Sequence, residues 1–215
     1  MKFEKTEVWG FEHAIRGTRN PLESWDKSDS CYIDKRFNDQ FHIGKNDLAL
    51  MQKLIKAGSE HRKFLRQIFV AVDITAPLFW WKEFDTYKVG TVANSTSTMH
   101  KLASTPITID CFEMDDFEDC KDDSNVYVSA IWIESITRLE KLRQTYNATK
   151  DKRYWKELIR LLPESWLQKR TITMNYENIL NMYRQRKNHK LTEWSKSFCD
   201  WVKTLPYAEE LICLE

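Results

Sequence analysis

Three polar residues near the C-terminal end of the sequence have a spacing that suits a ligand site. They are Asn175, Asn181 and Arg186. Asn175 and Arg186 are eleven residues apart, which is close to three turns of an α-helix. If one helix covers both, they share a face and lie about 16 Å apart along its axis. Because an ordinary amphipathic helix does not need two amides and a guanidinium placed this way, the spacing predicts a site for an extended, polar and anionic ligand.

Each candidate residue also has a purely structural interpretation. Asn175 has the side chain of a helix cap. Asn181 and Arg186 can be solvated surface groups. His61 can be a structural histidine, and Lys88 can be a cation that stabilises the C-terminal end of a helix. The sequence alone leaves both interpretations open.

The composition indicates one soluble globular protein. A chain of 215 residues can bury a sizeable core and forms one large domain or two small ones. Because no clear linker divides it, we expect a single domain over residues 1–215. The mean hydropathy is −0.59, no apolar run approaches the ~20 residues of a membrane span, and the first residues lack the apolar core of a signal peptide. The five cysteines form no CxxC pair, which favours free thiols. We therefore expect a cytoplasmic protein without a membrane partner.

Several site classes are not favoured by the sequence. The net charge of +1 selects neither nucleic acid nor membrane. The basic stretch 184–190 is short and ends a predicted helix, which favours a solvated helix end over a site for a ligand phosphate or for nucleic acid. No glycine-rich phosphate loop is present. We find no metal-ligand cluster and no Ser-His-Asp or Cys-His arrangement, so no metal ligand and no catalytic residue is assigned. The acidic stretch 110–123 is expected to be a surface loop.

The residue pattern predicts a helix-rich fold with a few strands. Many aromatic residues and few glycines favour bulky helical packing. Trp80 and Trp81 are expected to be core or subunit-contact aromatics, and the alternative is that they stack on a flavin. We expect a short apolar strand or turn over 7–20, and extended or looped chain over 91–98. Expected strands cover 67–73 and 167–174. Expected helices cover 46–56 (capped by Asn46 or Asp47), 58–66, 75–88 (capped by Thr75), 126–147, 150–162, a segment from 175, and 190–203.

Taken together, three stretches resemble the flavin-dependent thymidylate synthases, the ThyX family. The first is Glu60-His61 with Phe64, followed by the apolar run 68–73. The second is 79–100, where the family has an Arg-His-Arg triad and then a Ser-x-Asn-Glu-x-Ser run. The third has the most specific spacing, and it consists of Leu162-Pro163, Asn175, Asn181 and Arg186. The resemblance covers roughly residues 45–205.

The sequence departs from the family pattern at charged positions. The Arg-His-Arg triad aligns with Thr86-Tyr87-Lys88, and the Ser-x-Asn-Glu-x-Ser run with 91–97. A family arginine near Leu-Pro falls on Ile159, beside Arg160, and another falls on Glu177. Losing one charge-assisted guanidinium contact costs about 1.5–3 kcal/mol. That is roughly a tenfold to hundredfold loss of affinity, so these changes bear on which ligand is bound.

The resemblance implies a fold and a cofactor. The fold would be α+β and ThyX-like, with a small antiparallel sheet wrapped by helices. The protein would form a homotetramer with sites for FAD and a nucleotide at subunit interfaces. NADPH would reduce FAD, methylenetetrahydrofolate would supply one carbon, and dUMP would be methylated. By family position His61, Lys88, Asn175 and Asn181 would face the flavin.

The same comparison assigns the nucleotide side of the site and leaves the activity open. Ser97, Arg160 and Arg186 would face the nucleotide. The leading interpretation is an FAD-dependent, thymidylate synthase-like methyltransferase. The alternatives are a non-catalytic nucleotide-binding or interaction protein on the same scaffold, and an oligomeric protein that has lost the cofactor. The changed triad at Thr86-Tyr87-Lys88 keeps these alternatives open.

Overall fold

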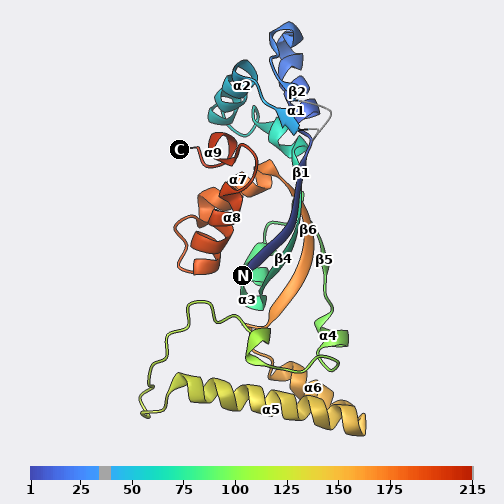
Figure 1. The fold of residues 1–215 in the computed structure, drawn as a ribbon, viewed down its shortest axis with the longest axis vertical. Helices are drawn as coiled ribbons and strands as arrows, with labels where there is room; N and C mark the ends of the chain where they lie inside the picture. The colour runs from blue at the N-terminus through green and yellow to red at the C-terminus, as the bar shows by residue number, and fades with distance from the viewer. Residues whose placement is uncertain (34–39, 215) are drawn as a thin grey trace. The chain divides into compact units, whose positions relative to one another are not determined.

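The computed structural model describes residues 1–33 and 40–214 (Figure 1). The chain divides into two compact units, which we describe one at a time. Unit 1 comprises residues 1–2, 74–86 and 94–170, and unit 2 comprises residues 3–73, 87–93 and 171–215. The assignment of the whole chain to a single domain stays a prediction. Among the described residues, no helix combines the length and apolar character that crossing a bilayer requires.

A four-stranded sheet contributes strands to both units. Its spatial order is β1 (Lys2–Trp9), β4 (Phe69–Pro77), β6 (Leu167–Asn175) and β5 (Val92–Ser95). Along β4 every second residue from Val70 to Ala76 is buried, which is the period of a strand with one face on a core. A separate antiparallel pair joins β2 (Cys31–Ile33) to β3 (Gln40–His42), with Tyr32 opposite Phe41.

Unit 2 contains most of the short helices. They are α1 (Phe11–Arg19), α2 (Lys45–Lys56), the 3-10 segments η1 (Asn20–Leu22), η2 (Trp25–Lys27) and η3 (Lys63–Gln67), α7 (Tyr176–Arg186), the π-helical segment η5 (Glu193–Phe198), α8 (Cys199–Lys203) and α9 (Ala208–Leu211). Aromatic rings join them: Phe11 makes edge contacts with Tyr176 and Tyr207. Because Tyr176 begins α7 and is fully buried, this cluster fixes the start of that helix.

A buried carboxylate connects α1, α2 and the chain between them. Asp47 of α2 is fully buried and accepts hydrogen bonds from Arg19 Nε and Nη2 at 2.9 and 2.7 Å. The same carboxylate accepts bonds from the hydroxyls of Ser28 and Ser30 at 2.7 and 2.6 Å. Because a guanidinium and two hydroxyls donate to this carboxylate, the burial of its charge is compensated.

Unit 1 is built around a helical hairpin. Its helices are α3 (Leu78–Phe84), α4 (Thr98–Lys101), the 3-10 segment η4 (Ile109–Cys111), α5 (Val128–Thr149) and α6 (Lys152–Arg160). In Figure 1, α5 and α6 run side by side, in agreement with their contacts. Their inner faces enclose a core of Leu102, Ile107, Phe112, Leu139 and Leu158.

The prediction that Trp80 and Trp81 belong to the core is confirmed. Both are almost fully buried. Their rings contact each other and Phe84. The indole of Trp81 donates to the backbone oxygen of Gln168 at 2.9 Å, and the guanidinium of Arg170 lies 4.2 Å from the centre of its ring. These contacts connect α3 to the start of β6 within unit 1.

Several predicted boundaries are wrong. Thr75 does not cap a helix, because β4 continues through this β-branched residue to Pro77 and α3 begins only at Leu78. Residues 11–19 form α1 instead of a strand or turn, with Phe11, Ala14 and Ile15 buried at helical spacing.

The start of α2 also differs from the prediction. Neither Asn46 nor Asp47 caps it, and Gly44 occupies the cap position. The carboxylate of Asp29 accepts hydrogen bonds from the backbone N–H groups of Asn46 and Asp47 at 2.9 and 3.1 Å. A residue far away in the sequence therefore satisfies the amides that a local side chain was expected to bind.

Candidate functional site

Helix α7 and its N-cap contain the three residues whose spacing predicts a ligand site. Asn175 immediately precedes it as the N-cap. Its Oδ1 accepts a hydrogen bond from the backbone N–H of Asn178 at 3.0 Å. In return, Oδ1 of Asn178 accepts a hydrogen bond from the backbone N–H of Asn175 at 3.2 Å. This reciprocal pair is a capping box built from two asparagines. The structural interpretation of Asn175 is therefore confirmed, and its predicted contact with a flavin stays a prediction.

Arg186 ends α7 and is held by aromatic side chains. Its Nε donates to the hydroxyl of Tyr87 at 2.9 Å. Its guanidinium carbon lies 5.6 Å from the centre of the Tyr87 ring and 5.1 Å from that of Trp194. The interpretation of Arg186 as a merely solvated group is therefore wrong, because cation–π contacts and a hydrogen bond fix its orientation.

The loop after α3 follows α7 along much of its length. The hydroxyl of Tyr87 donates to Oε1 of Gln185 at 2.9 Å, near the end of the helix. At the start of the helix, Nδ2 of Asn178 donates to the backbone oxygen of Val89 at 2.6 Å. Gly90 has φ +81°, and a Cβ there would lie 3.0 Å from Nδ2 of Asn175. The loop that contains the changed triad is therefore fastened to α7 at both ends.

Asn181 lies on a different side of α7 from Asn175 and Arg186. At about 100° per residue it is rotated roughly 120° from them. Its Oδ1 accepts a hydrogen bond from Nη2 of Arg62 at 3.1 Å. The three residues thus share one helix, as predicted, but they do not share one face.

An ion-pair cluster surrounds Asn181. Glu177 is one turn before it on α7 and is buried, with 8% of the residue exposed. Its Oε1 accepts a hydrogen bond from Nε of Arg62 at 3.3 Å, and its Oε2 forms an ion pair with Nε of Arg66. Arg62 is itself largely covered, with 14% of its side chain exposed. The position where the family often has an arginine is here an acid paired to two arginines.

Arg184 adds a third guanidinium to this side of the helix. It follows Asn181 by three residues, which places the two side chains next to each other. In the described part of the chain, no residue forms an ion pair or a side-chain hydrogen bond with it. Partial desolvation and the nearby charge of Arg62 lower the pKa of Arg184. Three guanidinium groups against Glu177 and the more distant Glu60 leave this surface with an excess of positive charge.

His61 and Lys88 occupy exposed positions in unit 2. His61 lies in the turn between α2 and η3, directly before Arg62. Lys88 lies in the loop fastened to α7, next to Tyr87. Neither is packed into the core, so both side chains are accessible to a ligand. Their predicted contact with a flavin stays a prediction.

The remaining two predicted site residues belong to unit 1. Ser97 is the N-cap of α4, and its Oγ accepts the amide of His100 at 3.2 Å. Arg160 ends α6 and forms an ion pair with Glu157, with 60% of its side chain exposed. Both have structural partners of their own. Their predicted role toward a nucleotide stays a prediction.

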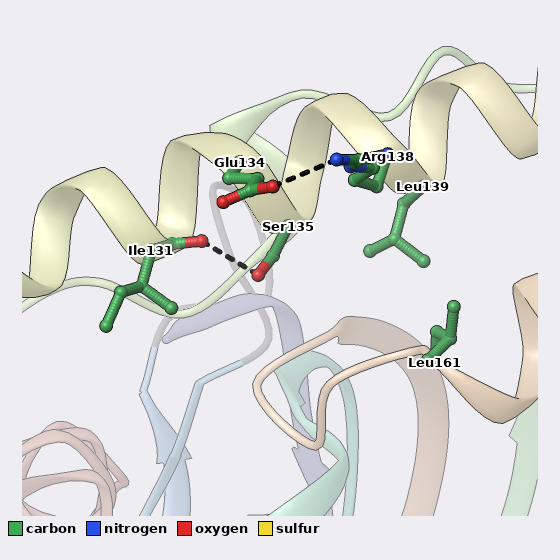
Figure 2. A pocket seen from close by; sticks show the side chains of 6 residues that line it. All are labelled: Ile131, Glu134, Ser135, Arg138, Leu139 and Leu161. Carbon is green, nitrogen blue, oxygen red and sulfur yellow. Dashed lines mark hydrogen bonds and ion pairs between the residues drawn. The ribbon is translucent and has the colours of Figure 1, made fainter.

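A hollow of about 290 Å³ in unit 1 offers less chemistry. Figure 2 shows its lining by α5 and by the residue after α6. The lining residues are Ile131, Glu134, Ser135, Arg138, Leu139 and Leu161. Glu134 and Arg138 form an exposed pair at 3.1 Å, and the Ser135 hydroxyl donates to its own helix at Ile131. Since these polar groups already have hydrogen-bond or ion-pair partners within α5, we do not take this hollow as the candidate site.

The sequence did not reveal the charged cluster. The sequence gives no reason to place Arg62 or Arg66 at a site, it shows Arg184 only as part of the basic stretch 184–190, and it shows Glu177 only as a departure from the family pattern. The available signal was the spacing of 177, 181 and 184, which places three polar side chains on one helical face. Within the described residues, no group of three or more His, Cys, Asp or Glu side chains is arranged to hold a metal ion.

Comparison with solved structures identifies the fold. No protein-family model matches the sequence, and no curated protein sequence matches it significantly. A structure of ThyX from Helicobacter pylori, a flavin-dependent thymidylate synthase complexed with FAD and dUMP, matches with a TM-score of 0.70. The match covers 100% of both chains at 17% sequence identity. The chain has the ThyX fold.

Two further structures agree with this assignment. A second structure of Helicobacter pylori ThyX with FAD and dUMP gives a TM-score of 0.70 at 16% identity, covering 99% of this chain and 97% of that one. A UMP/dUMP methylase, PolB from Streptomyces cacaoi bound with 5-Br dUMP, gives 0.62 at 12% identity, covering 99% and 94%. The ThyX fold confirms the predicted α+β, helix-rich class with small antiparallel sheets.

Proposed function

We propose that this protein binds FAD and a uridine nucleotide and acts as a thymidylate synthase-like methyltransferase on dUMP. The observation that supports this most strongly is the ThyX fold over the full length of the chain, shared with structures complexed with FAD and dUMP. NADPH and methylenetetrahydrofolate are the proposed co-substrates.

The donor groups of unit 2 fit such a cofactor. FAD combines an amide-like ring system with a diphosphate, and around α7 the chain offers amides and guanidinium groups. Asn181 and Arg62 stand on one side of the helix, and Arg186 is oriented on another. FAD, when bound, supplies the redox chemistry, and the protein supplies binding and electrostatics. We assign His61, Lys88, Asn175 and Asn181 to the flavin.

The nucleotide would be held by cations and a hydroxyl. Arg186, whose guanidinium is oriented by two rings, and Arg160 suit a phosphate, because guanidinium groups form charge-assisted bonds with phosphate oxygens. Ser97 can offer its hydroxyl as a donor while its oxygen caps α4. In this proposal the chain provides binding and orientation without a nucleophile.

A second candidate is a nucleotide-binding protein without catalysis. The observation that favours it is the contact between Tyr87 and Arg186. In the family pattern the loop at 86–88 carries two arginines and a histidine, and here Tyr87 binds a neighbouring arginine instead. A protein with this loop can retain the ligand and lose the reaction.

Spectroscopy followed by an activity assay tests the two candidates. Purified protein that is yellow, with absorbance near ~450 nm, or that becomes so with added FAD, supports the cofactor. Colourless protein that cannot be reconstituted would overturn the flavin proposal. With flavin bound, tritium release from labelled dUMP in the presence of NADPH and methylenetetrahydrofolate supports the enzyme. Binding of dUMP without release supports the second candidate.

We also propose that the protein is a homotetramer, as the resemblance implies. The measurement is the molar mass in solution by light scattering coupled to gel filtration. A mass near four times the chain mass of 25.8 kDa is expected. A monomer at all concentrations would contradict the tetramer and leave the flavin proposal to its own test.

A further inference from the structure

The side of α7 that faces η3 has an unusual charge distribution. Glu177, Asn181 and Arg184 follow one another at helical spacing and form one polar strip. Arg62 reaches this strip from the chain before η3 and contacts Glu177 and Asn181 at 3.3 and 3.1 Å. Arg66 binds the other oxygen of Glu177. Each oxygen of the carboxylate is therefore already paired with an arginine, and Arg184 is not one of these partners.

Arg184 is the residue that this arrangement leaves uncompensated. A third guanidinium near Arg62 repels it, and such repulsion has no benefit for folding. No described acid is close enough to Arg184 to form an ion pair. Clusters that are electrostatically unfavourable in the protein alone are a feature of binding sites, where a ligand supplies the missing charge.

We propose that Arg62 and Arg184, together with the amide of Asn181, form a binding site for phosphate groups. Two guanidinium groups and an amide donor match the oxygens of a phosphate better than they match a single carboxylate, because they present many donors in fixed planes. We assign the site to the diphosphate of the flavin cofactor, and this assignment rests on the proposed function.

In this proposed site, Glu177 is a positioning residue that orients Arg62. It is buried and bonded to Nε of Arg62, while Nη2 of the same guanidinium reaches Asn181. Holding a guanidinium by one edge fixes its plane and reduces the rotamer freedom lost on binding. The cation that the family has on α7 at position 177 is thus replaced by Arg62, which precedes η3, and by Arg184.

The test is a titration of the full-length protein with ligands that differ in phosphate. FAD, FMN and riboflavin are titrated by calorimetry into the wild type, Arg184→Gln, Arg62→Gln and the control Arg138→Gln. Arg138 is an exposed arginine of α5 in unit 1. Each site variant is expected to weaken FAD roughly tenfold to a hundredfold. Riboflavin affinity is expected to stay unchanged, since riboflavin has no phosphate.

Arg184→Gln is the decisive variant, because it removes no described ion pair. Its unfolding free energy should equal or exceed that of the wild type while its FAD affinity falls. Wild-type FAD affinity in this variant would overturn the phosphate site and leave the proposed function intact. If the wild type binds no flavin, inorganic pyrophosphate becomes the probe. Pyrophosphate binding that depends on Arg184 supports the site without the proposed function, and no binding overturns it.

Discussion

The hydroxyl of Tyr87 accepts a hydrogen bond from Nε of Arg186 at 2.9 Å and donates one to Gln185 at 2.9 Å. By resemblance, Tyr87 stands at the centre of the Arg-His-Arg triad. The family offers a titratable imidazole there, whereas this chain has a phenol that anchors an arginine. At this position the chain therefore has a neutral phenol that fixes the end of α7.

Tyr87→Phe tests this anchoring. It removes both hydrogen bonds and keeps the ring, so we expect a loss of about 1 kcal/mol in the free energy of unfolding. Urea denaturation measures it. Tyr154→Phe on α6 is the control, because the Tyr154 hydroxyl binds none of the described residues. Equal midpoints for the two variants would show that the Tyr87 hydroxyl does not stabilise the fold.

Substitutions of Asn175 separate its cap role from its predicted role toward the flavin. Asn175→Ala should lower stability by about 1 kcal/mol, since the amide of Asn178 loses its acceptor. Asn175→Ser should restore most of that stability, because serine is also a good cap. If the serine variant also binds FAD as the wild type does, Asn175 acts only as a cap. If it is stable but binds FAD weakly, the amide contacts the flavin.

Asp47→Asn tests the buried carboxylate of unit 2. The variant leaves Arg19, which is 6% exposed, without its counter-ion. Breaking a buried pair in this way typically costs about 3–5 kcal/mol. Chemical denaturation should show a large drop, whereas the control Asp200→Asn should show little, because Asp200 forms an exposed pair with Lys203. A small effect at Asp47 would mean that hydrogen bonds from the serine hydroxyls and backbone amides, without the ion pair to Arg19, are enough to stabilise the fold here.

Glu140 makes the stability of unit 1 sensitive to acid. Hydrogen bonds from Arg143, together with those from Ile107 and Gln144, outweigh desolvation and hold the pKa of Glu140 at about 2. A carboxylate with a lowered pKa in the folded state stabilises the fold above its unfolded pKa, near 4.5. That stabilisation should disappear as the pH falls from 4.5 toward 2.

The measurement is the unfolding free energy against pH for the wild type and Glu140→Gln. The variant should be less stable at neutral pH, and its curve should be flatter between pH 4.5 and 2. Identical slopes would refute the assignment to Glu140. Arg143 and Asn147 also bind the backbone oxygen of Ala103, so the variant additionally reports on how α5 holds that loop.

Much of the fold could be predicted from periodicity, and much of the site could not. Helices α5, α6 and α7 and strand β6 lie close to their predicted ranges, because long amphipathic patterns and alternation are local signals. The cap of α2 was missed, because Asp29 reaches it from another segment. The pairing of Glu177 with Arg62 and Arg66 was missed for the same reason: residues 111 or more apart in sequence meet only through tertiary packing.

The attachment of residues 87–90 to both ends of α7 limits how the molecule can move. Asn178 holds Val89 near the first turn, and Gln185 and Arg186 hold Tyr87 near the last. A segment bonded at two points to a well-packed helix opens only when that helix is disturbed. This segment should therefore behave as a rigid wall, so a ligand must adapt to it and cannot be enclosed by it.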